Sequence, residues 1–466
     1  MNMNPNLITR RDFFTRAATA AAGTTVAGSV TLLRAAEAPD PQEHQSTEIR
    51  GHKQDGAGQQ FAPGLPWKDY TPVITPNNVA LPFKIVGGIK IFHLVAEEVP
   101  EHEFAPGLKA HCWGYNGSVH GPTIEAVEGD HVRIYVTNKL PEETTVHWHG
   151  VLVPNGMDGV AGLTQKAIEP GQTYKYEFVL RQHGTYMYHS HADDMIQLAL
   201  GLMGLFIVHP RTPERPAPER DFALLLSEWR IDPGTMRPNP TEMTEFNVFT
   251  INGRTYPGTD PLVAKFGDRV RIRIGNLSAM DHHPIHVHGY AWKITETDGG
   301  PIPESAQWPE TTVLVPVGQT RTVEFLADNP GDWPLHCHMS HHTMTQMGHG
   351  APNLIGVRTG NLDEKVSGLL KGYMTMGESG MFGMGEMRMK APRNSLPMGG
   401  APGKYGYIDM GGMFTVVKVR ENLTDYNDPG WYEPPAGTLA DLASEADLKN
   451  DLGEIEASSL GPQNRR

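Results

Sequence analysis

Histidines recur at alternate positions in four short segments of the chain. These segments are 147–150 (HWHG), 189–191 (HSH), 283–289 (HPIHVHG) and 336–342 (HCHMSHH). In a β-strand, residues i and i+2 point to the same face, so each His-x-His pair can present two imidazoles to one site. Imidazole is a common ligand of transition metals. The spacing therefore predicts a set of histidines that surrounds a group of metal ions.

Cys337 lies between two histidines of the last segment. Its side chain should point away from His336 and His338, toward the opposite face of the strand. A blue-copper site combines two histidines, one thiolate and a weak axial ligand that is often methionine. The residues that fit these roles are His283, Cys337, His342 and Met347. The backbone on either side of Cys337 would then link this centre to the histidine-bound ions by a short electron path.

The elements that must position these side chains are short β-rich runs separated by Gly, Pro and Asn, which is typical of β-sandwich domains. The clearest runs are 89–95, 131–136, 173–180, 270–274 and 320–326. Parts of the sequence also repeat. GDHVRI at 129–134 recurs as GDRVRI at 267–272, and the HSH and HCH triplets are separated by the same interval as two GQT triplets (336 − 189 and 318 − 171, both 147).

This repeat predicts an all-β fold of two homologous β-sandwich domains. The predicted divisions are an arm or linker at 39–83, a first domain at 84–210, a second domain at 219–421 and a C-terminal tail at 422–466. Gly, Pro and Met are enriched at about 361–410, which we interpret as a Met-rich insertion before the last strand of the second domain. Thioethers are soft ligands that suit Cu(I).

The composition suits a soluble globular protein, with 39% hydrophobic and 20% charged residues. A net charge of −14 argues against nucleic acid or an anionic membrane as a partner. Arg10 and Arg11 precede a run of small residues and a small-x-small triplet at 36–38, so residues 1–38 resemble a twin-arginine signal peptide. The run is too short and too rich in Ala, Gly and Thr for a membrane anchor. We therefore expect export, to the periplasm or elsewhere, by the twin-arginine route.

The four histidine segments, in this order, resemble the signature of the multicopper oxidases over residues 85–360. This resemblance implies that the two sandwiches are cupredoxin-like Greek-key domains. It also implies an enzyme that passes electrons from a donor through a type 1 copper to a trinuclear cluster, which reduces O2 to water. It implies four copper ions per chain: one type 1, one type 2 and a binuclear type 3 pair. The implied type 2 ligands are His147 and His286. The implied type 3 ligands are His149, His189, His191, His288, His336 and His338. The implied type 1 ligands are His283, Cys337 and His342, with Met347 axial.

Only residues 192–282 separate the second and third segments, which is too few for a spacer domain. The chain therefore resembles the two-domain, laccase-like members, which form homotrimers. A head-to-tail ring of subunits would place each trinuclear cluster between the first domain of one chain and the second domain of its neighbour. The intervals between repeated segments identify the first-domain counterparts of the type 1 ligands, and none is a usual blue-copper ligand. These counterparts are Thr144, Ser190, Met195 and Leu200.

The resemblance also suggests where electrons and protons enter. The donor would deliver electrons near His283, whose edge is usually exposed in the family. Asp158 lies where family members carry an acid close to the type 2 copper, so we expect it to supply protons. Asp193 and Asp194 also follow a histidine segment, but turn or capping chemistry is the favoured interpretation for both. The neighbours of His342 are not carboxylates, which puts a second proton relay in doubt.

Several donors and functions stay open at this point. Cu(I) or another metal ion is the favoured donor, and the alternative is a laccase that oxidises phenols or aromatic amines. A copper nitrite reductase carries its blue site in the first domain, so Cys337 in the second domain argues against it. A copper store would not need a complete electron path. The remaining histidines near the segments are interpreted as supporting or surface groups, and Cys112 is given no role: these histidines are His120, His131, His282, His341 and His349.

Overall fold

The computed structural model describes most of the chain between the arm and the tail. The described residues are 61–344 without 215 and 233, the single positions 365 and 369, 393–396 and 400–452. All of them belong to one compact unit, Gln59–Arg466. The predicted signal peptide, Met347, His349 and most of the Met-rich segment lie outside the described residues. Among the described residues, no helix has the length and apolar character needed to cross a bilayer.

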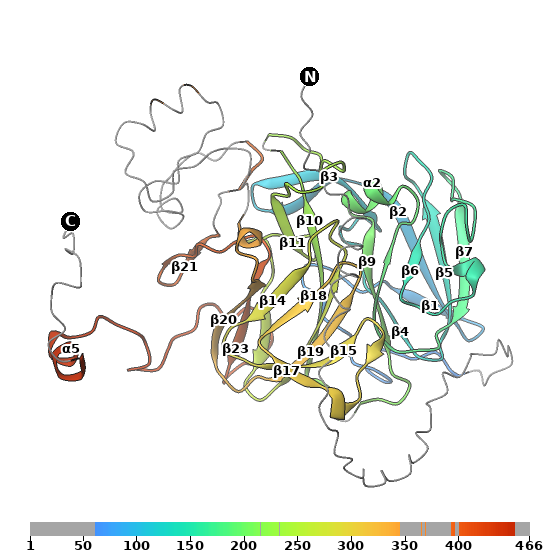
Figure 1. Ribbon diagram of the computed structural model, residues 1–466. Helices are drawn as coiled ribbons and strands as arrows, with labels where there is room; N and C mark the ends of the chain where they lie inside the picture. The colour runs from blue at the N-terminus through green and yellow to red at the C-terminus, as the bar shows by residue number, and fades with distance from the viewer. Residues whose placement is uncertain are drawn as a thin grey trace, which may run out of the picture. The chain divides into compact units, whose positions relative to one another are not determined.

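The first sandwich consists of two sheets (Figure 1). One sheet has the order β1 (Phe83–Val86), β2 (Ile89–Ala105), β5 (His131–Asn138) and β7 (Thr173–Val179), with β3 (Leu108–Tyr115) paired to β2. The other has the order β4 (Ile124–Val127), β9 (Met203–His209), β8 (Gly184–His189) and β6 (His147–His149). Strict alternation of partly exposed and buried residues along β5 shows why this sequence forms a strand with one face in the core.

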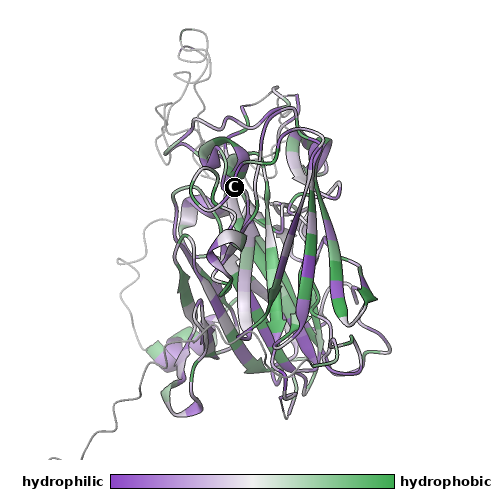
Figure 2. Cartoon of the chain, turned by 90° about the vertical axis from the view of Figure 1, so that its right-hand side faces the viewer, coloured by the Kyte–Doolittle hydropathy of each residue, from purple (hydrophilic) through white to green (hydrophobic). Residues whose placement is uncertain are grey.

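The second sandwich also consists of two sheets. One has the order β11 (Val248–Ile251), β10 (Arg220–Trp229), β13 (Arg269–Asn276), β19 (Thr320–Leu326), β15 (Trp292–Thr297) and β16 (Gly300–Pro301), with β17 (Trp308–Glu310) paired to β15. The other has the order β12 (Leu262–Lys265), β23 (Phe414–Arg420), β20 (Gly331–Cys337), β14 (His283–Val287) and β18 (Thr312–Val315). Hydrophilic and hydrophobic bands alternate along many of the strands (Figure 2).

The two sandwiches repeat one topology. The parallel pair β2 and β5 corresponds to β10 and β13, and the parallel pair β4 and β9 corresponds to β12 and β23. In each sandwich the strand that carries a histidine segment, β8 or β20, pairs antiparallel with a second such strand, β6 or β14. The prediction of an all-β protein with two cupredoxin-like Greek-key β-sandwiches is confirmed.

The few remaining elements are short. They are the 3-10 turns η1 (Asn155–Met157), η2 (Glu304–Ala306) and η3 (Ser340–Thr343), the helices α2 (Asp194–Ala199) and α5 (Glu445–Leu452), and the two-stranded pair β21 (Pro402–Gly403) and β22 (Gly406–Tyr407). Two of these elements matter for the sites below. Turn η3 carries His342, and helix α2 follows the HSH segment of the first sandwich.

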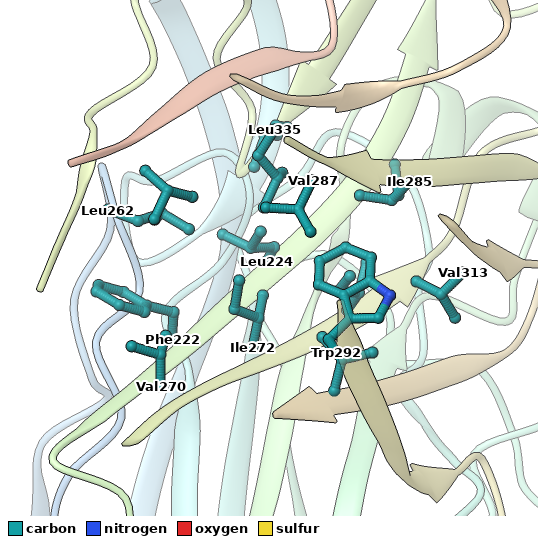
Figure 3. Close-up of a cluster of buried hydrophobic side chains, with 14 of the residues drawn as sticks. Phe222, Leu224, Leu262, Val270, Ile272, Ile285, Val287, Trp292, Val313 and Leu335 are labelled. Carbon is teal, nitrogen blue, oxygen red and sulfur yellow. The ribbon is translucent and has the colours of Figure 1, made fainter. Parts of the chain in front are cut away.

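Each sandwich has its own apolar core. In the second, Leu224 and Ile272 from one sheet pack against Val287 and Leu335 from the other, beside the fully buried Trp292 (Figure 3). Burial of one such side chain stabilises the fold by about 1.5–3 kcal/mol. Val287 lies between His286 and His288 at the end of β14, and Leu335 precedes His336 in β20. The core therefore fixes which way each histidine points.

Strand β2 is the main departure from the predicted elements. The sequence predicted a strand at 89–95, whereas β2 runs on to Ala105. Glutamates at 97, 98 and 101 interrupt the apolar alternation, which hides the second half of the strand. Register shifts against β3 on both sides of His102 and Glu103 accommodate the interruption. Phe104 then reaches a separate apolar cluster that contains Trp229 of the second sandwich.

A buried polar network joins the two sandwiches. Arg273 of β13 donates two hydrogen bonds of 2.8 and 2.9 Å to Asp221. It donates a third, of 2.9 Å, to Thr185 of β8, and its contact with Glu296 measures 3.2 Å. Arg273 is fully buried, so each of these partners compensates part of its desolvation. The network holds the histidine-bearing strand β8 against the second sandwich.

Candidate metal centres

The three predicted type 1 ligands that the structure describes converge in the second sandwich. Cys337 Sγ lies 3.6 Å from His283 Nδ1 and 3.5 Å from His342 Nδ1, and the two Nδ1 atoms are 3.2 Å apart. Strand pairing places Ile285 opposite Cys337, so His283 and Cys337 point to the same inner face. Turn η3 brings His342 back over the end of β20. The fourth predicted ligand, Met347, lies outside the described residues.

These distances fit a single bound metal ion. A tetrahedral ion with ordinary bond lengths separates two ligand nitrogens by about 3.3 Å and a nitrogen from a sulfur by about 3.5 Å. All three side chains are buried, with 0%, 0% and 5% exposure for His283, Cys337 and His342. Two imidazoles and one thiolate in this arrangement are the donor set of a blue-copper centre. The residues present therefore fit copper.

Contacts at the Nε2 atoms of both imidazoles orient their Nδ1 atoms toward the thiol. His283 Nε2 lies 2.6 Å from Ser278 Oγ, and His342 Nε2 lies 3.3 Å from Asp281 Oδ2. These contacts occupy the far nitrogens and leave each Nδ1 for the metal. Burial lowers the pKa of His283 to about 3 and raises the pKa of the Cys337 thiol to about 12. The imidazoles are thus neutral at neutral pH, and a bound ion must displace the thiol proton.

The expectation that donors meet an exposed edge of His283 is wrong. The ring of His283 is fully buried, and its outer nitrogen is occupied by Ser278. It is His342 that lines a small surface pocket, together with Asp281 and Met344. The physical reason is the loop between β13 and β14, which folds Ser278 over His283. The sequence contains no pattern that distinguishes the two rings.

The HWHG and HSH segments form the first half-site, defined here as His147, His149, His189 and His191. Strands β6 and β8 pair with His147 opposite His189, while Trp148 points into the core. His149 Nδ1 and His189 Nε2 lie 3.2 Å apart, again the separation of two nitrogens on one ion. The His191 ring lies 5.5 Å from that of His147, centroid to centroid. All four predicted ligands of this sandwich are brought together.

The second half-site comprises His286, His288, His336 and His338. Strands β14 and β20 pair with His286 opposite His336. His288 Nε2 and His336 Nε2 lie 3.2 Å apart, and the ring centroids of His286 and His338 are separated by 5.5 Å. Cys337 is buried beneath them on the other face of the strand, whereas His338 is exposed. The predicted division of the HCH triplet between two faces matches this geometry.

Four of the half-site imidazoles have lowered pKa values, and the two half-sites remain separate within the described part of the chain. Burial lowers the pKa of His189 to about 3 and also lowers the pKa of His149, His288 and His336. Among the described residues, ring contacts connect the members of each half-site, but none connects one half-site to the other. Each half-site therefore offers four of the eight predicted histidines.

Of the three predicted acids, Asp158 and Asp194 lie beside half-site histidines. His147 Nδ1 lies 2.7 Å from the Asp158 carbonyl oxygen and 3.5 Å from its carboxylate. The next residue, Gly159, has no room for a side chain, because a Cβ at this position would lie 1.9 Å from Val146 O. Asp194 Oδ2 lies 3.4 Å from His191 Nδ1, so it is closer to the site than the capping interpretation suggested. Asp193 stands at the N-cap of α2 without a side-chain capping bond.

A hydrogen-bonded pocket occupies the type 1 position of the first sandwich. The Gln197 side-chain oxygen accepts hydrogen bonds from Thr144 Oγ1 at 2.7 Å and from Ser190 Oγ at 2.6 Å. Its amide nitrogen donates to Glu143 O at 2.8 Å. The sequence intervals identified Thr144 and Ser190 but missed Gln197. The one available signal was an amide within the otherwise apolar run of α2.

The other histidines have structural partners. His120 Nε2 lies 2.8 Å from Ser227 Oγ, and His131 lies 3.0 Å from Glu177. His282 Nδ1 accepts a hydrogen bond from Val317 N at 3.0 Å. Cys112 and Cys337 are both free and buried. Cys337 belongs to the type 1 group, whereas Cys112, His120, His131 and His282 belong to none of the three groups described above.

Comparisons with known proteins agree with this geometry. Copper resistance protein A of Escherichia coli is 29% identical over 232 residues, which are 40% of this chain and 38% of that protein. The chain thus spans well under half of the curated relatives it matches. The structure of a blue copper oxidase from Nitrosomonas europaea superposes with a TM-score of 0.52 at 27% identity, covering 71% of this chain and 85% of that one. The multicopper oxidase mgLAC gives 0.54 at 27% identity, covering 73% and 91%.

Family models extend the agreement to the histidine segments. Two models, both described as multicopper oxidase, match residues 98–213 and 232–353, which together are about half of the chain. The first range contains the first half-site. The second contains the type 1 residues and the second half-site. The chain belongs to the multicopper oxidase family.

Proposed function

We propose that the protein is an oxidase that couples one-electron oxidation of a donor to reduction of O2 to water. Four donors each lose one electron, and O2 takes up these four electrons with four protons to give two water molecules. One observation carries the proposal. Cys337 belongs to the buried type 1 group, while its neighbours His336 and His338 belong to a half-site on the opposite face.

Copper supplies the one-electron couple and the oxygen-binding site when it is bound. We infer four ions per chain: one at the type 1 group and three at the paired half-sites. The residues of the chain orient the metal ligands, exclude water and supply protons. Ser278 and Asp281 orient the two imidazoles, and the surrounding core excludes water from Cys337. Asp158 is the proposed proton source beside His147.

We infer that each oxygen-reducing cluster is completed by a neighbouring chain in a homotrimer. Each half-site supplies half of the required histidines, and exposed apolar side chains border both. Leu163 is 81% exposed in the loop that hydrogen-bonds to His191, and Met195 is 61% exposed just beyond it. Leu314 and Met339 are similarly exposed beside the second half-site. Exposed apolar residues around incomplete polar sites support a protein interface.

Subunit mixing tests this arrangement. His147→Ala damages only the first half-site, and His336→Ala damages only the second. If clusters form between chains, co-assembly of the two inactive variants restores about a quarter of the wild-type oxygen uptake, because that share of interfaces combines two intact halves. The control is the same mixture without subunit exchange. A mixture that stays inactive after confirmed co-assembly contradicts the shared cluster.

Cu(I) or another small metal ion is the proposed donor. The pocket at His342 offers the Asp281 carboxylate and the Met344 thioether, and thioethers suit Cu(I). Its volume is about 50 Å³, which is small beside an enclosed cavity of about 150 Å³ that binds benzene. Oxygen uptake with Cu(I) and with 2,6-dimethoxyphenol discriminates the donors. A higher kcat/KM for the phenol would instead assign laccase activity.

Export is part of the proposal. The twin-arginine pattern at Arg10 and Arg11 supports transport to the periplasm or beyond. Replacing both residues with lysine should retain the protein inside the cell. Fractionation of cells that express the full chain checks this result, and unchanged export would contradict the route.

A further inference from the structure

A buried carboxyl group stands behind the type 1 group, with no cation paired to it among the described residues. Glu228 lies on β10 and is 4% exposed. Its Oε1 accepts hydrogen bonds from Met280 N at 2.6 Å and Asp281 N at 3.2 Å. Its Oε2 has no hydrogen-bond partner among the described residues, and none of the ion pairs found there includes Glu228. A buried acid with so few partners is costly, so packing alone does not account for it.

The segment that Glu228 holds is the one that contacts His342. Residues 277–282 connect β13 to β14, and in this connection Asp281 Oδ2 faces His342 Nε2 at 3.3 Å. Asn276 Nδ2 donates a hydrogen bond to Asp281 O at 3.0 Å from the other side. Leu277 and Ser278 are buried, but residues 279, 280 and 282 are exposed, so the part of the connection around Asp281 has little burial of its own. The bonds to Glu228 therefore do much to determine where Asp281 points.

The strand that carries Glu228 also supports the other side of His342. Glu228 pairs in register with Phe249 of β11. The Phe249 ring stacks on the His342 imidazole, with 4.2 Å between centroids and 17° between planes. One pair of strands thus fixes both the ring plane and the outer nitrogen of the same imidazole. Burial, and then the nearby Asp281, raise the pKa of Glu228 to about 8.

We propose that Glu228 is a positioning residue for electron entry, which keeps Asp281 against the outer nitrogen of His342. The inference rests on the proposed function, because it assigns His342 and Asp281 to the donor side. Glu228 itself does not touch the donor or the metal. It acts through the two backbone N–H groups at positions 280 and 281.

Two substitutions separate positioning from charge. Glu228→Leu removes the acceptor, whereas Glu228→Gln retains an oxygen that can accept both N–H groups. In the copper-loaded protein, we expect Glu228→Leu to raise KM for Cu(I) about tenfold, as misplacement of a positioning group does, and to shift the visible band of the type 1 centre. Glu228→Gln should keep both values near wild type. Equal defects in both variants would overturn the positioning role.

A matched control and a double variant complete the test. Glu125→Gln alters another buried carboxylate, far from His342 in sequence and bonded to His209, and should change neither readout. If Glu228 acts through Asp281, adding Glu228→Leu to Asp281→Asn raises KM no further. Additive effects would place its action elsewhere and overturn the inference. Absence of oxygen uptake by the wild type would refute the proposed function instead, and the band shift would still test the positioning of His342.

Discussion

The type 1 position of the second sandwich and the equivalent position of the first contain different side chains. In the second sandwich, His283, Cys337 and His342 converge with a geometry that fits a metal ion. In the first, the equivalent position holds Thr144 and Ser190, both hydrogen-bonded to Gln197. The strands around the two pockets follow one topology. The sandwich therefore does not require a metal ion at this position, because the Gln197 side-chain amide fills the equivalent space in the first sandwich.

The two pockets also differ in what they need from outside the chain. The Gln197 oxygen accepts hydrogen bonds from both hydroxyls, and its nitrogen donates one to Glu143 O. The polar groups of this pocket therefore find their hydrogen-bond partners within the chain. In the second sandwich, two neutral imidazoles direct Nδ1 lone pairs toward each other and toward a thiol. That arrangement is complete only with a cation. The first pocket is therefore structural, and the second is built for a ligand.

The largest effect should follow from Cys337→Ser, which gives the second pocket the hydroxyl found in the first. We expect the visible blue band and the oxidation of donors to be lost, because the hydroxyl does not replace the thiolate ligand. Metal analysis should find one copper ion fewer per chain, with the half-sites still loaded. A blue variant would contradict the assignment of the type 1 centre.

The next largest effect concerns the first half-site, which the first sandwich retains although it lacks a type 1 centre. His147→Ala should stop oxygen reduction, because this half-site is proposed to complete the cluster. The blue band should survive, since His283, Cys337 and His342 are untouched. Anaerobic reduction of that band by the donor checks the point. Normal turnover of the variant would remove His147 from the cluster.

A change in the first pocket alone should affect stability without affecting colour. Gln197→Leu leaves the buried hydroxyls of Thr144 and Ser190 without their common acceptor. The free energy of unfolding should fall by about 1–3 kcal/mol, the range for buried polar groups that lose a partner. Urea titration measures this loss. A change in the blue band would show that the pockets are not independent.

The smallest expected effect is on the pH dependence of folding stability. It distinguishes an imidazole that is only buried from one that binds a metal ion. His120 is buried outside both pockets, and burial lowers its pKa from 6.5 to about 3. Between these values the unfolded chain binds a proton that the folded chain does not. The stability contributed by neutral His120 is thus full above pH 6.5 and is lost as the pH falls toward 3.

His120→Gln should therefore flatten the decrease in stability between pH 6.5 and 4, by the same amount with and without copper. Thermal unfolding at several pH values checks this in both forms. A flattening that appears only in the copper-free protein would tie His120 to a metal site and break the distinction between the two kinds of buried imidazole.

Local patterns in the sequence predicted the metal-ligand candidates better than they predicted the residues that surround these candidates. Alternation sets which face a residue occupies, so the opposite directions of Cys337 and His336 could be predicted without a structure. The repeat likewise predicted Thr144 and Ser190 as counterparts of metal ligands. These features depend on neighbours within one strand or on a fixed interval between copies.

What could not be predicted depends on contacts between distant segments. Gln197 belongs to the first pocket because its side-chain oxygen accepts a hydrogen bond from Thr144, which lies 53 residues earlier in the chain. His283 is covered because Ser278 lies on a connection whose path no local pattern specifies. Glu228 reaches Asp281 from a strand that precedes it by about fifty residues. Burial and hydrogen bonding at such positions follow from tertiary packing, which overrides local preference.

Oxygen uptake by the copper-loaded protein, measured together with donor consumption, tests the central claim most directly. Electrons that enter at the type 1 group of the second sandwich and reach a complete cluster should reduce one O2 for every four Cu(I) ions oxidised, without hydrogen peroxide. Uptake of one O2 for every two Cu(I) ions, with peroxide as the product, would contradict the complete cluster. No uptake with either Cu(I) or 2,6-dimethoxyphenol would contradict the oxidase itself.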